Sequence, residues 1–160
     1  MRTALKTLFF MLLVPGIFLG CVPIWSMAAD TALFSFGVFR WLAIPFWLAG
    51  AMVMLWCAWD FTFKGRGTPA PIDPPKELVI TGLYRYVRNP MYVGALILLG
   101  GYIFWFPSRA IIAFPIVFFI DFHLFVLAYE EPTLRRKFGT AYGDYCKSVP
   151  RWIPKFGKHA

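Results

Sequence analysis

The sequence is short of charged residues. Asp, Glu, Lys and Arg make up only 15% of its 160 residues, whereas 59% are hydrophobic and the mean hydropathy is +0.63. Soluble globular domains contain about a quarter charged residues and about half apolar ones, so this composition excludes an ordinary soluble domain. It predicts an integral membrane protein. No internal repeat is evident, and we expect residues 1–160 to form a single membrane domain.

Cysteine is also scarce. The three cysteines, Cys21, Cys57 and Cys146, are odd in number and lie far apart in the chain. Disulfide frameworks and metal sites use closely patterned sets of ligands, so this spacing predicts neither. We interpret each cysteine as a small apolar filler.

Acidic residues are outnumbered by basic ones, 8 to 16, which gives a net charge of +8. Lys and Arg in short loops of membrane proteins stay on the cytoplasmic side. With both termini inside, the outer segments hold only Arg40 and Arg109. The inner segments then hold Arg2, Lys6, Lys64, Arg66, Lys76, Arg85, Arg88, Arg135, Arg136, Lys137, Lys147, Arg151, Lys155 and Lys158. We therefore expect cytoplasmic N- and C-termini in a bacterial inner membrane, with membrane lipids and not nucleic acid as partners of the basic rim.

Four apolar runs are long enough to cross a hydrocarbon core, which needs about 20 helical residues. They span approximately residues 8–25, 39–63, 90–106 and 110–128, and the third is at the short limit. The sequence thus predicts an all-α membrane protein with about four transmembrane helices.

The first run has an alternative interpretation as a signal peptide, with Arg2 and Lys6 before it and Ser26-Met27-Ala28 as a cleavage site. Its apolar length of about 18 residues exceeds the usual 7–15, and Trp25 resembles an interfacial anchor. We favour a retained helix.

Residues 64–89 form a long connection between the second and third runs. The prolines in this connection forbid a helix and favour extended chain along the membrane surface; they are Pro69, Pro71, Pro74 and Pro75. Leu78-Val79-Ile80 indicates a short strand-like piece. A connection of this length is usually functional or disordered.

Asn89-Pro90 predicts the start of the third helix, with the Asn89 side chain as cap and Pro90 as first helical residue. The positive end of the helix dipole would then face the cytoplasmic interface, where it favours an anion. Phe106-Pro107-Ser108-Arg109 predicts a tight outer turn, so that helices three and four form an antiparallel hairpin.

The fourth helix is expected to carry Asp121 and His123 in its apolar part and to end at Glu130-Glu131-Pro132. An interfacial amphipathic helix is expected after Pro132. Its apolar side would hold Leu134, Phe138, Tyr142 and Tyr145, and its polar side Arg135, Arg136 and Lys137.

Each polar residue near the membrane has a structural alternative. Glu130 and Glu131 could be solvated charges paired with Arg85 or Arg88, and Asp121 and His123 could be satisfied inside the bundle. Some other residues also have structural explanations: Tyr84, Tyr86 and Tyr92 as an aromatic belt, and Gly94, Gly100 and Gly101 as sites of close helix packing. Function is favoured because a helix start, two glutamates and several tyrosines converge at one depth.

These residues resemble a known family. The matching stretches are Thr81-Gly82-Leu83-Tyr84, Arg88-Asn89-Pro90-Met91-Tyr92-Val93-Gly94, Glu130-Glu131, Phe138-Gly139, Tyr142, Tyr145 and Val149-Pro150-Arg151-Trp152-Ile153-Pro154. Together they resemble the bipartite signature of the isoprenylcysteine carboxyl methyltransferase and phospholipid methyltransferase family of integral membrane enzymes. The resemblance covers roughly the last 90 residues.

The resemblance implies an S-adenosylmethionine-dependent methyltransferase that acts on a hydrophobic or amphipathic acceptor at the cytoplasmic face and releases S-adenosylhomocysteine. Consistent with a membrane fold, no G-x-G-x-x-G motif follows a strand. The cofactor site would be lined by Tyr84, Asn89, Pro90, Met91, Tyr92 and Glu130, with Lys76, Glu77, Leu78 and Val79 contributing from the loop. Glu131, Arg88 and Arg151 are the candidate catalytic residues, and no metal is expected.

Two positions depart from the family pattern. Many relatives carry His where this chain has Asn89, which cannot titrate and so is not assigned as a base. The eukaryotic isoprenylcysteine enzymes carry a carboxylate-binding arginine where this chain has Val126, which disfavours prenylcysteine as the acceptor. The acceptor thus stays open: an isoprenylcysteine-like carboxylate, a phospholipid amine, a quinol-like hydroxyl or a small thiol.

An amine or hydroxyl acceptor needs a base, for which Glu131 or the Asp121/His123 pair are candidates. A second hypothesis makes the chain a small helical subunit of a transporter or redox complex, with Asp121 and His123 relaying protons.

Overall fold

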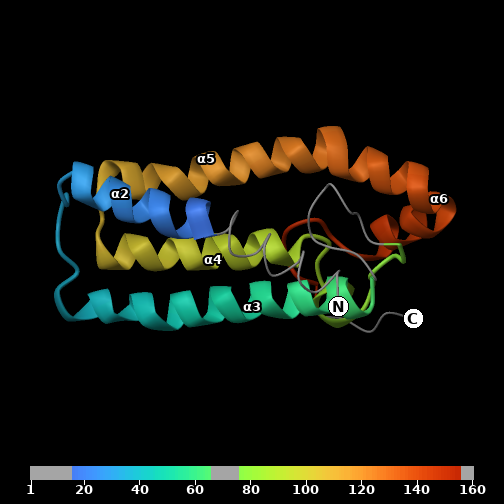
Figure 1. Cartoon of the computed structure of the whole chain (residues 1–160), viewed down its shortest axis with the longest axis horizontal. Coiled ribbons are helices and arrows are strands. Elements are labelled where there is room, and N and C mark those ends of the chain that lie inside the picture. The colour runs from blue at the N-terminus through green and yellow to red at the C-terminus, as the bar shows by residue number, and fades with distance from the viewer. Residues whose placement is uncertain (1–15, 66–75, 156–160) are drawn as a thin grey trace.

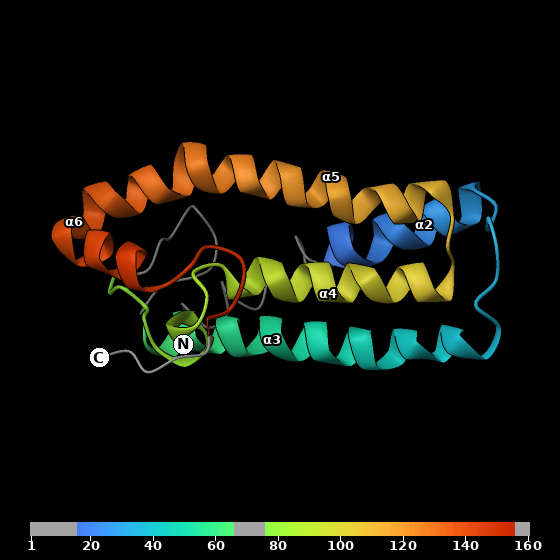
Figure 2. The same ribbon diagram turned by 180° about the vertical axis from the view of Figure 1, so that it is seen from behind.

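The computed structural model describes residues 16–65 and 76–155, and this part of the chain is all-α, as the sequence predicts (Figure 1). Its elements in order are η1 (Gly16–Cys21), α2 (Val22–Ala29), η2 (Gly37–Leu42), α3 (Ala43–Phe63), η3 (Gly82–Arg85), α4 (Pro90–Trp105), α5 (Arg109–Phe125), η4 (Val126–Glu130) and α6 (Glu131–Ser148). The helices α2 to α5 lie roughly along one long axis, and Figure 2 shows α2 between α4 and α5 at one end of the bundle.

The described part contains two helical segments long and apolar enough to span a membrane, Gly37–Phe63 and the segment that begins at Arg109. The helix α4 is shorter, with 16 residues, as the third predicted run suggests. Residues 8–15 of the first predicted run lie outside the described part, and its remainder is helical in η1 and α2. The number of four spans therefore stays a prediction.

The helices α3 and α4 pack closely because small residues face each other at their crossing. A Cβ on Gly94 would lie 2.8 Å from Val53 Cγ1 and 3.1 Å from the Gly50 carbonyl oxygen. A Cβ on Gly101 would lie 2.6 Å from the Trp47 ring, whereas one on Gly100 would reach only ordinary contact with Phe46, at 3.4 Å. The packing role is thus confirmed for Gly94 and Gly101.

The outer turn between α4 and α5 is confirmed as a tight hairpin. The Ser108 backbone N–H donates to the Phe106 carbonyl at 2.9 Å, and the Ser108 hydroxyl caps α5 by accepting from the Ile111 N–H at 3.2 Å. Because this turn is short, the end of α5 returns to the same end of the bundle as the start of α4.

The fourth predicted helix does not end at Glu130-Glu131-Pro132, which corrects the sequence-based boundary. The chain stays helical from α5 through the π-helical segment η4 into α6, and the Glu131 N–H donates to the Val126 carbonyl five residues back. Pro132 is tolerated because it occupies the first turn of α6. The helix turns back on itself at Gly139, whose φ of +56° lies in the left-handed region (Figure 2).

The predicted amphipathic helix corresponds to α6. Tyr142 and Tyr145 are buried with Val149, and Leu134 and Phe138 pack against them. The expected strand-like piece at Leu78-Val79-Ile80 is wrong: these residues have no regular secondary structure. Val79 instead packs with Cys57 and Tyr84, so its apolar character reflects burial against α3 rather than strand pairing.

Candidate functional site

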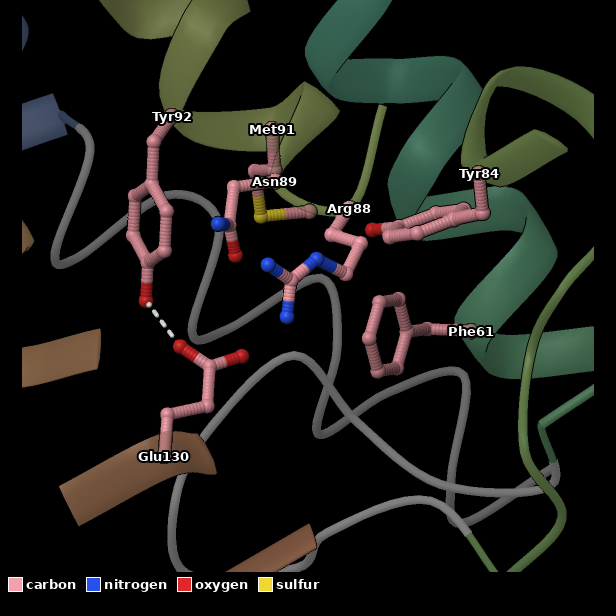
Figure 3. Close-up of a pocket in the computed structure, with 7 residues that line it drawn as sticks. All are labelled: Phe61, Tyr84, Arg88, Asn89, Met91, Tyr92 and Glu130. Carbon is pink, nitrogen blue, oxygen red and sulfur yellow. Dashed lines mark hydrogen bonds between the residues drawn. The ribbon is translucent and has the colours of Figure 1, made fainter. Parts of the chain in front are cut away.

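A pocket lies at the end of the bundle where α3 ends, α4 begins and η4 passes by (Figure 3). It encloses about 300 Å³ of empty space including its open mouth. Seven residues line it: Phe61, Tyr84, Arg88, Asn89, Met91, Tyr92 and Glu130. The fold thus brings together five of the residues expected at the cofactor site, Tyr84, Asn89, Met91, Tyr92 and Glu130, together with the candidate catalytic residue Arg88.

Glu130 reaches the pocket from η4, just past the last predicted span. The wider π-helical turn changes the register of the side chains, as such turns often do at functional sites. The Tyr92 hydroxyl donates to Glu130 Oε2 at 3.1 Å, and the Tyr92 ring packs on Phe122 with centroids 4.6 Å apart. Burial raises the pKa of the Glu130 carboxyl, although the Tyr92 hydroxyl partly opposes this. The site therefore holds a desolvated, oriented carboxyl group.

Two aromatic rings form the opposite wall of the pocket. Phe61 comes from the last turn of α3 and Tyr84 from η3, and the two rings meet edge to face with centroids 5.4 Å apart. The Tyr84 backbone carbonyl accepts from the Tyr145 hydroxyl at 2.7 Å, which ties η3 to α6. Such a corner suits a flat ring or a cation.

Glu131 lies in a cluster with two arginines. Arg88 Nη1 donates to Glu131 Oε1 at 3.0 Å, and Arg151 donates to the same carboxylate through Nε at 2.7 Å and through Nη2 at 3.2 Å. Burial raises the pKa of Glu131, but the hydrogen bond from Arg151 and the charge of Arg88 outweigh burial and lower it overall. All three candidate catalytic residues therefore lie together, but as an ion cluster in which Glu131 is fully engaged.

The pairing of Glu131 with Arg88 matches the structural alternative that the sequence left open. Arg85, the other arginine considered, is exposed. Glu130 does not fit that alternative, because it is partly buried and its hydrogen bond goes to Tyr92. The two adjacent glutamates thus have different surroundings and, by this geometry, different roles.

Arg88 combines the ion cluster with the pocket. Its Nη1 donates to Glu131 and, at 2.9 Å, to Cys146 Sγ, while its Nε is buried with no hydrogen-bond partner among the described residues. A buried donor without an acceptor is costly, so this atom favours an anionic or carbonyl group in the pocket. The nearby start of α4, whose first N–H groups have no partner within the helix, favours an anion as well.

Asn89 lines the pocket but, contrary to the sequence-based prediction, its side chain does not cap α4. Its Nδ2 donates instead to the Arg151 carbonyl at 3.1 Å, and the cap position shows no side-chain hydrogen bond. The Asn89 amide bonds there because the segment 149–155 runs alongside Arg88 and Asn89. The Arg88 backbone N–H also donates to this segment, to the Pro150 carbonyl at 2.9 Å. Pro90 is the first residue of α4, as expected, and it is buried without lining the pocket.

The loop residues 76–79 do not line the described pocket. The backbone N–H groups of Lys76 and Glu77 donate to the Gly65 carbonyl at 2.8 and 3.3 Å, and both residues are exposed. Leu78 packs against the Tyr142 cluster and Val79 against Tyr84. Their contribution to the site is therefore indirect in this structure.

Asp121 and His123 do not form a pair. Because they are two residues apart on a helix, their side chains are about 200° apart around its axis and project from nearly opposite sides. His123 Nδ1 accepts from Trp152 Nε1 at 2.9 Å, whereas Asp121 is exposed. The geometry thus offers no support for a relay between them.

Phe61 is a pocket residue that the sequence analysis missed. It lies four residues after Cys57, and therefore one turn further along the same face of α3. The available signal was that the end of the predicted helix 39–63 and Tyr84 were both expected at the cytoplasmic face. The chain has 18 Phe, most of them in apolar runs, and the sequence contains nothing that selects this one among them.

The family model described as phospholipid methyltransferase matches residues 38–141, which is more than half of the chain. The matched region contains every residue that lines the pocket. No curated protein and no solved structure matches the chain significantly.

Proposed function

Because the chain belongs to the phospholipid methyltransferase family, we propose that the pocket between α3, α4 and η4 binds its cofactor and that the methyl group goes to a lipid amine at the cytoplasmic membrane face. Membership makes the protein an integral membrane, S-adenosylmethionine-dependent methyltransferase with a lipid-like acceptor. The alternative of a proton-relaying transporter or redox subunit is not retained, since the family is one of methyltransferases.

The residues present fit the cofactor, which carries a carboxylate, an ammonium, a sulfonium and a flat base. The observation that carries the proposal is that a basic and an acidic group, the Arg88 guanidinium and the Glu130 carboxyl, point into the same pocket (Figure 3). Arg88 Nε and the start of α4 would hold an anionic group, and Glu130 would hold positive charge. The Phe61 and Tyr84 rings would hold the flat base.

The cytoplasmic face is supported by the distribution of cations over the two ends of the described bundle. The pocket end carries Lys64, Lys76, Arg85, Arg88, Arg135, Arg136, Lys137, Lys147, Arg151 and Lys155, and the other end carries Arg40 and Arg109. Positive residues favour the cytoplasmic side. Arg40 at the other end packs over the Trp41 and Trp105 rings, 5.1 and 4.5 Å from their centroids, as expected of an interfacial aromatic belt.

An amine acceptor is favoured over a carboxylate by the charges around the pocket. Val126, at the position where a carboxylate-binding arginine is expected in isoprenylcysteine enzymes, is apolar and buried in η4. Arg151 is already paired with Glu131, and Arg88, which shares that carboxylate through Nη1, has only its Nε left, which the proposal assigns to the anionic group of the cofactor, so neither guanidinium is available for a substrate carboxylate. Glu130 instead offers negative charge to an amine.

When bound, S-adenosylmethionine supplies an electrophilic methyl group. The chain's contribution is to align donor and acceptor and to exclude water, which the buried Tyr84 and the partly buried Phe61 and Tyr92 support. An amine that gains a methyl group must lose a proton, and Glu130 is the pocket carboxylate that would accept it. Its raised pKa makes it a better proton acceptor than an exposed glutamate, and Tyr92 fixes its orientation.

The test supplies methyl-labelled S-adenosylmethionine to the purified protein in vesicles that contain either phosphatidylethanolamine or a farnesylated N-acetylcysteine. We expect label that resists mild base in the phosphatidylethanolamine, because N-methyl groups are not hydrolysed. Label that mild base releases as methanol from the farnesylated compound would identify a methyl ester and refute the amine proposal.

A further inference from the structure

Asp60 is a buried carboxylate that the proposed chemistry does not use. It lies in the last turn of α3 with 1% exposure. Its Oδ1 accepts from Lys64 Nζ at 2.6 Å, whereas its Oδ2 is buried with no hydrogen-bond partner among the described residues. Leaving a carboxylate oxygen buried and unpaired is unfavourable, so its retention at this place requires a reason.

The unpaired Oδ2 lies against Gly82. A Cβ at position 82 would overlap Asp60 Oδ2 and would come within 3.2 Å of Trp56 Nε1. The φ of Gly82 is +61°, which disfavours any other residue as well. The hydrogen that Gly82 carries in place of a side chain therefore points at the carboxylate, in the manner of a weak C–H···O contact.

This contact sits beside the two aromatic residues of the pocket wall. Phe61 follows Asp60 directly, and Tyr84 is two residues after Gly82 in the same short 3₁₀ helix, η3. The contact between Asp60 and Gly82 thus lies where the segment that carries Tyr84 meets the helix that carries Phe61. Figure 3 shows the rings of Phe61 and Tyr84, which meet edge to face with centroids 5.4 Å apart.

We propose that Asp60 is a positioning residue of the cofactor pocket, which acts by holding the Gly82 turn so that Tyr84 stands against Phe61. This inference rests on the proposed function of the pocket. The neighbouring ties act at other points: the Gly65 carbonyl holds the N–H groups of Lys76 and Glu77, and Tyr145 holds the Tyr84 carbonyl. Asp60 fixes the turn between them.

A double-mutant cycle in nanodiscs tests the role of Asp60, with S-adenosylhomocysteine as the probe and its dissociation constant as the readout. We expect Asp60→Ala and Gly82→Ala each to raise the dissociation constant about fivefold, a modest effect for two residues in contact. The double variant should bind about as well as either single variant, because the methyl group introduced at position 82 then occupies the space that the carboxylate leaves.

Gly37→Ala is the matched control. Gly37 has the same kind of backbone conformation, with φ of +56°, but a Cβ there would meet nothing within 4 Å, and it lies at the other end of the bundle. We expect this variant to lose some thermal stability through backbone strain and to bind the probe as the wild type does. A purely structural role of Asp60 would likewise lower the melting temperature without changing the dissociation constant.

If Gly82→Ala does not fold, Asp60→Asn replaces it in the comparison. Asn keeps the volume beside Gly82, so it should restore binding to within about twofold of wild type while Asp60→Ala does not. A dissociation constant of Asp60→Ala equal to that of the wild type would overturn this inference but not the proposed pocket. So would a loss of affinity in the double variant that equals the product of the two single losses. Absence of probe binding by the wild type would instead refute the proposed cofactor pocket, and the inference with it.

Discussion

Replacement of Glu131 by Gln should strongly destabilise the fold, because Glu131 holds two arginines at once. Its carboxylate accepts three hydrogen bonds at 2.7, 3.0 and 3.2 Å from Arg151 and Arg88. The side chains of Glu131 and Arg88 are 9% and 10% exposed, and that of Arg151 is 30% exposed. Gln retains the shape and one acceptor, but it leaves both guanidinium charges uncompensated.

Removal of one partner from a buried ion pair typically costs about 3–5 kcal/mol. The lower end, about 3 kcal/mol, is expected here because water can reach Arg151, which reduces the penalty for leaving it unpaired. At about 2–4 °C per kcal/mol for a chain of this size, the melting temperature should fall by about 6–12 °C.

The assay is thermal unfolding of the protein in nanodiscs, followed by circular dichroism. The matched control is Asp144→Asn, which breaks the ion pair with Lys147 on the exposed face of α6, where the two side chains are 72% and 80% exposed. Exposed ion pairs contribute little, so this control should melt with the wild type. A Glu131→Gln melting temperature equal to that of Asp144→Asn would refute the reasoning, since the cluster would then contribute nothing to stability.

Two further predictions concern pH and helix packing. The pKa of Glu131 is lowered from 4.5 in the folded state, so its stabilising contribution is fully present above pH 4.5 and is lost as the pH falls below 4.5 through the folded pKa. Between pH 7 and pH 3 the melting temperature of the wild type should therefore fall more than that of Glu131→Gln. An equal fall of the two melting temperatures would contradict this prediction. Gly94→Ala should destabilise by about 1–3 kcal/mol through overpacking against Val53 and Gly50, as measured by the melting temperature. Gly100→Ala, which meets only ordinary contact, serves as its control, and an equal effect of both substitutions would contradict the packing assignment.

The helices themselves were predictable because apolar length dominates their formation in lipid. The second and third predicted runs, 39–63 and 90–106, agree with η2–α3 and α4 to within a few residues. Proline fixed the start of α4, and Pro107 with Ser108 fixed the outer turn. These are local signals, readable without knowledge of what packs where.

The errors concern groups whose partners lie far away in the sequence. Asn89 has the right chemistry for a helix cap, but its amide donates to the Arg151 carbonyl, 62 residues later. The π-helical segment η4 leaves no local mark, because Pro132 suggests an end to the helix and the sequence contains nothing that indicates a wider turn. Glu131 and Glu130 are adjacent and identical in type, and only tertiary packing separates them into an ion cluster and a pocket.

The pocket was predicted in part because its residues gather in two stretches rich in polar and aromatic residues, 81–94 and 130–154. Tyr84 and Tyr92 belong to the first and Glu130 to the second, and the hairpin of α4 and α5 brings them together. Phe61 and Asp60 belong to an apolar helix instead. Asp60 contacts the turn at Gly82, 22 residues later, and this contact between distant positions could not be predicted from the sequence.

The most direct test of the proposed pocket is the binding of S-adenosylhomocysteine to wild type, Glu130→Gln and Asp121→Asn, measured by titration calorimetry in nanodiscs. The control replaces an exposed carboxylate on α5 that does not line the pocket. We predict saturable binding to the wild type, a loss of about tenfold or more for Glu130→Gln, as expected for a hydrogen bond to a charged group, and no more than about a twofold change for Asp121→Asn. Absence of saturable binding by the wild type, or equal affinities of the two variants, would contradict the assignment of this pocket to the cofactor.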